Sequence, residues 1–171
     1  IVVDSITPFD DRTVDIYMHI EEGEKYYLRN ITWVGNTVYP SDYLAALLQM
    51  KKGDVYNQKL LGERTSTDED AIGNKYYNQG YVFYNLDPVE VNIVGDSIDL
   101  EMRIVEGPQA TINRVRINGN DRLYENVVRR ELRTKPGDLF NKDALERSYR
   151  EIAQMGHFNP ENIQPDVQPD A

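Results

Sequence analysis

The sequence predicts an α+β fold that repeats one small unit, with the element order strand, helix, helix, strand, strand. The first observation is a repeat, because the stretch from Leu28 to Asn57 returns farther along the chain with the same spacing. The second is a change of hydrophobic period, from two-residue alternation to helical stripes and back. The residues shared by the two copies are Gly35 and Gly119, Asp54 and Asp138, and Asn57 and Asn141, each pair 84 positions apart. A repeat of domain size fixes the organisation of the chain.

Composition excludes several classes of function. The 171 residues carry a net charge of −10, whereas a nucleic-acid binder needs clustered lysine and arginine, so no nucleic-acid partner is expected. The chain has no cysteine, which excludes disulfides, cysteine-ligated zinc and thiol nucleophiles. A hydrophobic fraction of 40% with 12 tyrosines is typical of a folded, half-buried sheet.

The chain opens inside an incomplete copy of the unit. Residues Thr13–Ile20 alternate apolar and polar side chains, which predicts a strand with one buried face. The same pattern returns 84 positions later, at Ser97–Ile104. We therefore expect residues 1–23 to be the C-terminal hairpin of a preceding unit, residues 24–107 to be a complete first unit, and residues 108–171 to be a second unit that lacks its closing strand.

The first unit is expected to begin with a strand over Lys25–Val34, on which Ile31 and Trp33 face the core. A leucine-striped helix follows, with Ser41 as its expected N-cap. The cations and glycine of Lys51-Lys52-Gly53 are expected to end that helix.

The second helix is where the two copies differ. Asn57 and Asn141 are expected to cap it in the two units. From Asn57 to Gly80 is 23 positions, but from Asn141 to Gly156 only 15, so the first unit carries 8 extra residues. We place this insertion around Thr65–Gly73, where the apolar stripe lapses, and expect it to project beyond the core.

The rest of the first unit is predicted to be a hairpin. A turn at Asp87-Pro88 is expected to precede a strand at Val89–Val94, and Gly95-Asp96 then turns the chain into the closing strand Ser97–Val105. The junction to the second unit, Gly107-Pro108, is short and partly rigid, which predicts limited hinge motion.

No residue pattern predicts an enzyme, a metal site or a cofactor site. His19 and His157 lack the spaced partners of a metal centre. Asp68-Glu69-Asp70 lacks the alternating oxygen ligands of a calcium loop, so a solvated acidic loop is expected. Asp54 and Asp138 are expected to satisfy backbone donors where the second helix begins.

The element order, the Gly-Asn pair after the first strand and the repeated motif Gly-Asp-x-Tyr/Phe-Asn together resemble the POTRA domain, covering nearly the whole chain. Tandem POTRA units resemble the periplasmic arm of the BamA family. The resemblance implies a three-stranded mixed sheet covered by two antiparallel helices, with the closing strand central and the second strand at an edge. It implies a non-enzymatic arm, periplasmic in a Gram-negative bacterium, that binds unfolded outer-membrane proteins.

The resemblance also implies partners: accessory lipoproteins or periplasmic chaperones, and the membrane β-barrel that follows the arm in the full-length protein. Two other POTRA functions stay open. One is a two-partner secretion transporter, which usually carries two units, whereas the hairpin at 1–23 implies at least three. The other is a cell-division or similar docking module, which is typically a single unit.

Two candidate binding surfaces follow. The first is the edge strand, whose backbone N–H and C=O groups could pair with an incoming chain. Its residues are Val89, Glu90, Val91, Asn92 and Ile93. The alternative is a purely structural role, in which Val89, Val91 and Ile93 face the core and no other chain pairs with the edge. The second surface is a basic cluster on the second unit, formed by Arg129, Arg130 and Arg133, which could dock an acidic partner or could be a solvated face.

Overall fold

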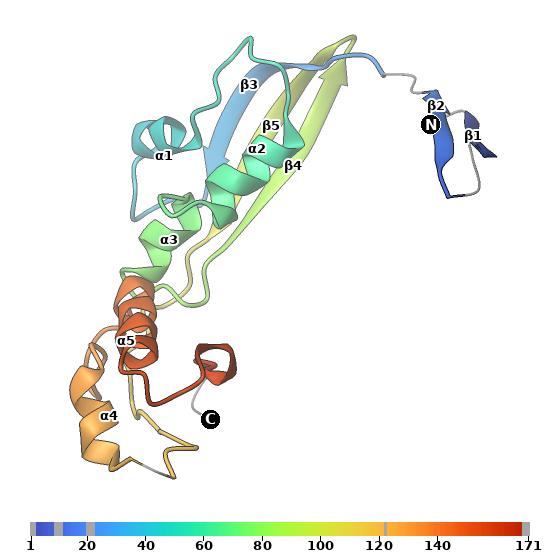
Figure 1. Ribbon diagram of the computed structural model, residues 1–171. Helices are drawn as coiled ribbons and strands as arrows, with labels where there is room; N and C mark the ends of the chain where they lie inside the picture. Colours follow the sequence, from blue (N-terminus) through green and yellow to red (C-terminus); the bar gives the residue numbers. More distant parts are fainter. Residues whose placement is uncertain (1–2, 9–11, 20–22, 122, 169–171) are drawn as a thin grey trace.

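A computed structural model describes residues 3–8, 12–19, 23–121 and 123–168. Figure 1 shows an elongated molecule in which the first unit lies between a small hairpin and the helices of the second unit. The hairpin pairs β1 (Val3–Pro8) with β2 (Val14–His19) in antiparallel register. The strand expected over Thr13–Ile20 is therefore present, although Ile20 lies outside the described residues. That this hairpin belongs to a preceding unit stays a prediction.

The sheet of the first unit confirms the expected topology. Its strands are β3 (Tyr27–Val34), β4 (Asn85–Val94) and β5 (Ser97–Val105), in the order β3–β5–β4. β5 lies parallel to β3 and antiparallel to β4, so the sheet is mixed. Alternate residues of β5 face the helices and are at most 5% exposed: Ile98, Leu100, Met102 and Ile104. Ile31 and Trp33 of β3 pack against the same core, as predicted.

The first helix, α1 (Ser41–Leu48), buries Leu44 and Leu48 completely, but both of its ends differ from the prediction. Pro40 occupies the N-cap position, and Ser41 is already helical. The helix also ends three residues before Lys51, because Gln49 adopts a left-handed conformation with a φ of 56°. This early end lets the next residue, Met50, turn back into the core, where it is 3% exposed.

The second helix of the first unit is broken into three pieces: α2 (Gln58–Gly62), the π-helical turn η1 (Glu63–Thr67) and α3 (Ile72–Tyr77). The expectation that the insertion projects beyond the core is wrong. Within it, Ala71 and Ile72 are fully buried, and Thr65 is only 8% exposed. A π-helical turn absorbs extra residues without leaving the helix path, so the chain returns to the core directly after the acidic loop.

The turn expected at Asp87-Pro88 is also wrong, since both residues lie inside β4 and Pro88 is opposite Met102. A proline cannot donate a backbone hydrogen bond, which usually excludes it from a central strand. At an edge the missing donor need not break a ladder, and β4 is an edge strand.

The second unit contains α4 (Glu125–Glu131), α5 (Lys142–Gln154) and the short 3₁₀ helix η2 (Pro160–Asn162). Residues 111–118 of the second unit correspond to β3 by the 84-residue offset of the repeat, but they form no ladder in the described structure, apart from one bridge between Thr111 and Leu139. In the first unit the equivalent strand, β3, pairs with the closing strand β5. No counterpart of β5 lies within the described residues of the second unit, so the segment equivalent to β3 has no described strand to pair with.

Candidate functional site

The candidate edge strand β4 has one side open along its whole length. In the described part of the chain it pairs with β5 alone, and no backbone hydrogen bond joins it to a loop. The helices of the first unit lie over one face of the sheet, and none of them covers the outer side of β4 (Figure 1). Three apolar side chains at its hairpin end are half exposed: Val91 at 50%, Ile93 at 53% and Val94 at 51%.

The expectation that Val89, Val91 and Ile93 could share the core face is wrong. Glu90 is opposite Leu100 and Asn92 is opposite Asp99, so Val91 is an extra residue, a β-bulge. A bulge reverses the alternation of faces beyond it. Val89 therefore lies on the helix-free face with its partner Glu101, whereas Ile93 lies on the helix side opposite Ile98.

A tyrosine beside β3, the strand at the opposite edge of the sheet, contacts β4 next to this bulge. Tyr56 lies beside the start of β3, where its backbone N–H donates to Tyr26 O at 2.7 Å. Its hydroxyl donates to Glu90 Oε1 at 2.9 Å, so its side chain links the β3 side of the unit to β4. Burial, reinforced by the Glu90 carboxylate, raises the pKa of Tyr56 to about 12. The hydroxyl therefore stays protonated and donating at neutral pH.

The three arginines of the basic cluster, Arg129, Arg130 and Arg133, are all paired with carboxylates. Arg129 donates to Glu125 and, at 3.3 Å, to the backbone oxygen of Val115. Arg133 forms a fork with Glu151, with Nη2 at 2.8 Å from Oε1, and this contact raises the pKa of Arg133. Arg130 contacts Glu131 at 3.3 Å, and its side chain remains 75% exposed. Arg130 is thus the member of the cluster most available to a partner.

The described residues contain no group of three or more metal-ligating side chains. No helix within the described ranges is long and apolar enough to cross a membrane. Asp54 and Asp138 have the structural role expected, but at a different place. Each accepts from a backbone N–H three residues earlier, on Lys51 at 2.8 Å and on Lys135 at 3.0 Å, so each closes the loop before the second helix. Asn57 and Asn141 cap those helices as predicted.

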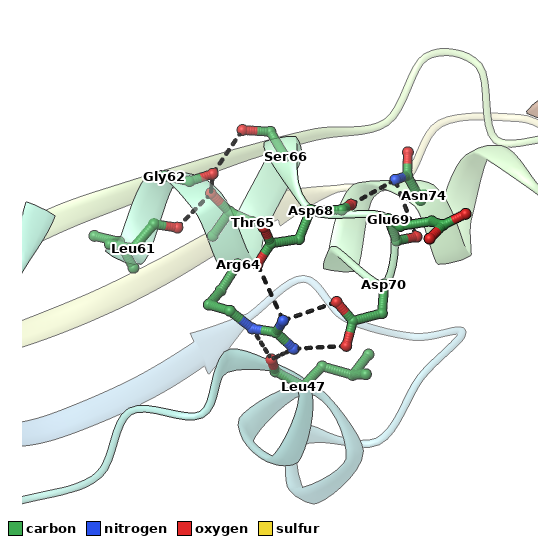
Figure 2. A network of polar contacts seen from close by, with 10 residues as sticks. All are labelled: Leu47, Leu61, Gly62, Arg64, Thr65, Ser66, Asp68, Glu69, Asp70 and Asn74. Atoms are coloured by element: carbon green, nitrogen blue, oxygen red, sulfur yellow. Dashed lines mark hydrogen bonds and ion pairs between the residues drawn. The ribbon is translucent and has the colours of Figure 1, made fainter. Parts of the chain in front are cut away.

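A polar network surrounds Arg64, a residue that no sequence pattern had marked (Figure 2). Its guanidinium donates twice to Leu47 O at the end of α1, at 2.9 and 2.7 Å. The same group contacts Asp68 at 3.1 Å and Asp70 at 2.8 and 3.0 Å, and it lowers the pKa of Asp70. The acidic loop is therefore tied down, not freely solvated. One sequence signal could have predicted part of this network. Arg64 lies four residues before Asp68, the first residue of an Asp-x-Asp pair, and residues at this spacing on a helix can contact each other.

The mixed three-stranded sheet, the helices that cover it and the repeat of this unit along the chain define a tandem module of small α+β domains. The chain belongs to the POTRA family, whose model, described as surface antigen variable number repeat, matches residues 26–107 and 110–171.

Relatives of this chain are named outer membrane protein assembly factor BamA. That of Neisseria meningitidis is 28% identical over 92% of this chain, and that of Nitratidesulfovibrio vulgaris is 24% identical over 88%. The chain spans 19% of the length of each. A crystal structure of the third to fifth POTRA domains of Haemophilus influenzae BamA has the same fold, with a TM-score of 0.69 and 20% identity. It matches 93% of this chain and 62% of its own.

Proposed function

We propose that this chain is part of the periplasmic arm of an outer-membrane assembly factor and that it binds unfolded outer-membrane β-barrel proteins. The homology to BamA proteins supports the assembly role. The observation that carries the binding step is the free edge of β4, at residues Val89–Ile93. An extended client segment would add there as a fourth strand, with its backbone pairing to the N–H and C=O groups of the edge.

Backbone pairing suits clients that share a conformation but not a sequence. Main-chain hydrogen bonds supply affinity without reading side chains, and only the pockets for alternate residues add preference. The half-exposed Val91, Ile93 and Val94 offer apolar contact to both faces of an added strand. Barrel strands alternate apolar and polar side chains, so they present an apolar side chain at every second position.

Site-specific photocrosslinking tests the edge. A photoreactive residue replaces Asn92 on β4 or Lys59 on α2; Lys59 is 84% exposed and serves as the helix-face control. An outer-membrane β-barrel protein diluted from urea serves as the client. We expect crosslinking at Asn92 to exceed that at Lys59. Equal labelling at the two positions would contradict the proposal.

A second measurement separates backbone from side-chain recognition. Hydrogen exchange of residues 89–94 should slow when the client is present, because newly paired amides are protected. The double variant Val91→Ser with Ile93→Ser should still crosslink, with reduced yield. If the double variant does not crosslink and the amides of the wild-type protein gain no protection, the client is recognised by side chains instead.

Accessory lipoproteins or periplasmic chaperones remain proposed partners, with Arg129, Arg130 and Arg133 as the docking surface. The Arg130 side chain is 75% exposed, against 42% for Arg129 and 63% for Arg133, so Arg130 would carry most of the contact. Charge reversal by Arg130→Glu should weaken capture of an acidic partner, and the loss should shrink as salt increases.

A further inference from the structure

The end of α3 in the first unit is bonded to the start of α5 in the second unit. Asn78, just after α3, is central, since its backbone oxygen accepts from Asn141 Nδ2 at 2.9 Å. Its side-chain oxygen accepts from the backbone N–H of Asp143 at 2.9 Å. That N–H belongs to the first turn of α5, where no intrahelical partner exists. One unit therefore helps to cap a helix of the next.

Further contacts between the two units lie on both sides of Asn78. Lys142 of α5 donates to Asn74 Oδ1 at 2.7 Å and lies 5.9 Å from the centre of the Tyr77 ring. On the other side, the backbone N–H of Ala110 donates to Gly80 O at 2.8 Å, and Gln109 Nε2 donates to Gln79 O at 2.9 Å. The units are thus joined along a line of contacts, and not by the peptide link alone.

Gly80 shows how closely the units approach. A Cβ on this residue would lie 2.7 Å from Leu139 Cδ1 and 3.3 Å from Ala110 O, both in the second unit. Gly156 occupies the equivalent position at the end of α5, with a φ of 71° against 84° for Gly80, and has nothing within 4 Å. Both glycines make the same kind of turn, but only Gly80 is crowded by the next unit. The close approach is therefore a property of this joint and not of the turn.

The inserted segment holds α3 in place for this contact. Arg64 fixes Asp68 and Asp70, the residues that lead into α3, to the end of α1 (Figure 2). Asn74 then joins the two networks, because its Nδ2 donates to Asp68 O at 2.8 Å while its Oδ1 accepts from Lys142 of the second unit. A continuous path of polar contacts runs from α1 to α5.

We propose that residues 64–71, which overlap the insertion placed around Thr65–Gly73, are a coupling element that holds α3 so that its end locks the second unit onto the first. The two units then turn as one rigid body, and the β4 edge keeps a fixed orientation relative to the second unit. The inference concerns the joint alone and does not depend on which client binds the edge.

Distance measurement between two spin labels tests the lock directly, because the chain has no cysteine of its own. Lys59→Cys on α2 and Asn126→Cys on α4 place one label on an exposed helical position of each unit. We expect a single narrow distance distribution for the otherwise unchanged chain. Asn141→Ala, Gly80→Ala and Arg64→Met should each broaden or shift it.

Each variant has a matched control inside the same chain. Asn57→Ala removes the equivalent helix cap, and Gly156→Ala strains the equivalent turn. Arg103→Met removes an ion-paired arginine on the helix-free face of β5. The controls should lower the thermal stability as their counterparts do, yet leave the distance distribution narrow. A broad distribution in the parent chain, or an unchanged one in Gly80→Ala, would overturn the proposal.

Discussion

Arg29 donates through Nε to Asp99 Oδ1 at 2.8 Å, at the level of the sheet where both outer strands carry an extra residue. Arg29 is itself the extra residue of β3, and Val91 is the extra residue of β4. Both bulges flank Asp99 of the central strand. The ion pair therefore joins β3 to β5 where their ladder is irregular. It holds in place the bulge of β3, because Arg29 is the bulge residue.

Asp99→Asn should lower the melting temperature slightly at neutral pH. The hydrogen bond from Arg29 holds the pKa of Asp99 below its ordinary value. A carboxylate with a depressed pKa contributes stability above its unfolded pKa, near 4, and loses that contribution as the pH falls through the folded value. The wild-type and variant melting temperatures should therefore converge in strong acid. A pH series of thermal melts measures this, and a gap of constant size throughout the acid range would contradict it.

Glu106→Ala should destabilise the first unit by about 1–3 kcal/mol, because it removes the acceptor of several donors. Glu106 Oε1 accepts from the backbone N–H of Thr37 at 2.8 Å and from the Tyr76 hydroxyl at 3.0 Å. Burial acts to raise the pKa of Glu106, but these donors outweigh burial and lower it.

The contribution of Glu106 should be full above about pH 4.3 and disappear as the pH falls through the folded pKa. Urea unfolding at pH 7 and pH 3 measures both values. Glu101→Ala, at a partly exposed residue of β5, the strand that ends one residue before Glu106, is the control and should change stability less. Equal losses in the two variants would show that the donors around Glu106 contribute nothing.

Tyr56→Phe should cost about 0.5–1.5 kcal/mol at pH 7, the usual value of one hydrogen bond. The bond lost is the one from Tyr56 to Glu90. Because the folded pKa is about 12, above the ordinary value of 10, the contribution is full below pH 10 and decreases as the pH approaches 12. The stability of the wild-type protein should therefore decline more steeply between pH 10 and 11.5 than that of the variant. Parallel slopes would contradict the assignment.

Gly35→Ala should be far more damaging than Gly53→Ala. Both glycines have a positive φ, 87° and 94°, so alanine is strained by about 1 kcal/mol or more at either place. A Cβ on Gly35 would also lie 2.1 Å from the backbone oxygen of Ile104, whereas one on Gly53 meets nothing within 4 Å. Backbone cannot move aside as a flexible side chain can. We expect Gly53→Ala to fold with modest loss of stability and Gly35→Ala to unfold or lose several degrees more in a thermal melt.

Sequence patterns were sufficient for the features that local chemistry controls. The alternation of Ile98, Leu100 and Met102 located the central strand, and the shared asparagines located two helix starts. These features depend on neighbours within a few residues, so a single sequence contains the information.

Features that depend on distant partners were not predictable in the same way. The bulge at Val91 arises because β5 has one residue fewer than β4 across that region, which no period within β4 reveals. Arg64 became buried because it meets Leu47 O, seventeen residues away, and two carboxylates together. Likewise Asn78 gave no local signal, since its partners Asn141 and Asp143 lie in another unit.

The joint at Asn78 has a consequence for geometry on a larger scale. A contact that relates one unit to the next by a fixed rotation and translation defines a screw operation. Any longer arm that reuses this joint would wind as a superhelix whose pitch is set by a few side chains at each boundary. The curvature of the arm would then depend on residues such as Gly80 and Asn78. Each added unit would lengthen the arm along the axis of the same superhelix.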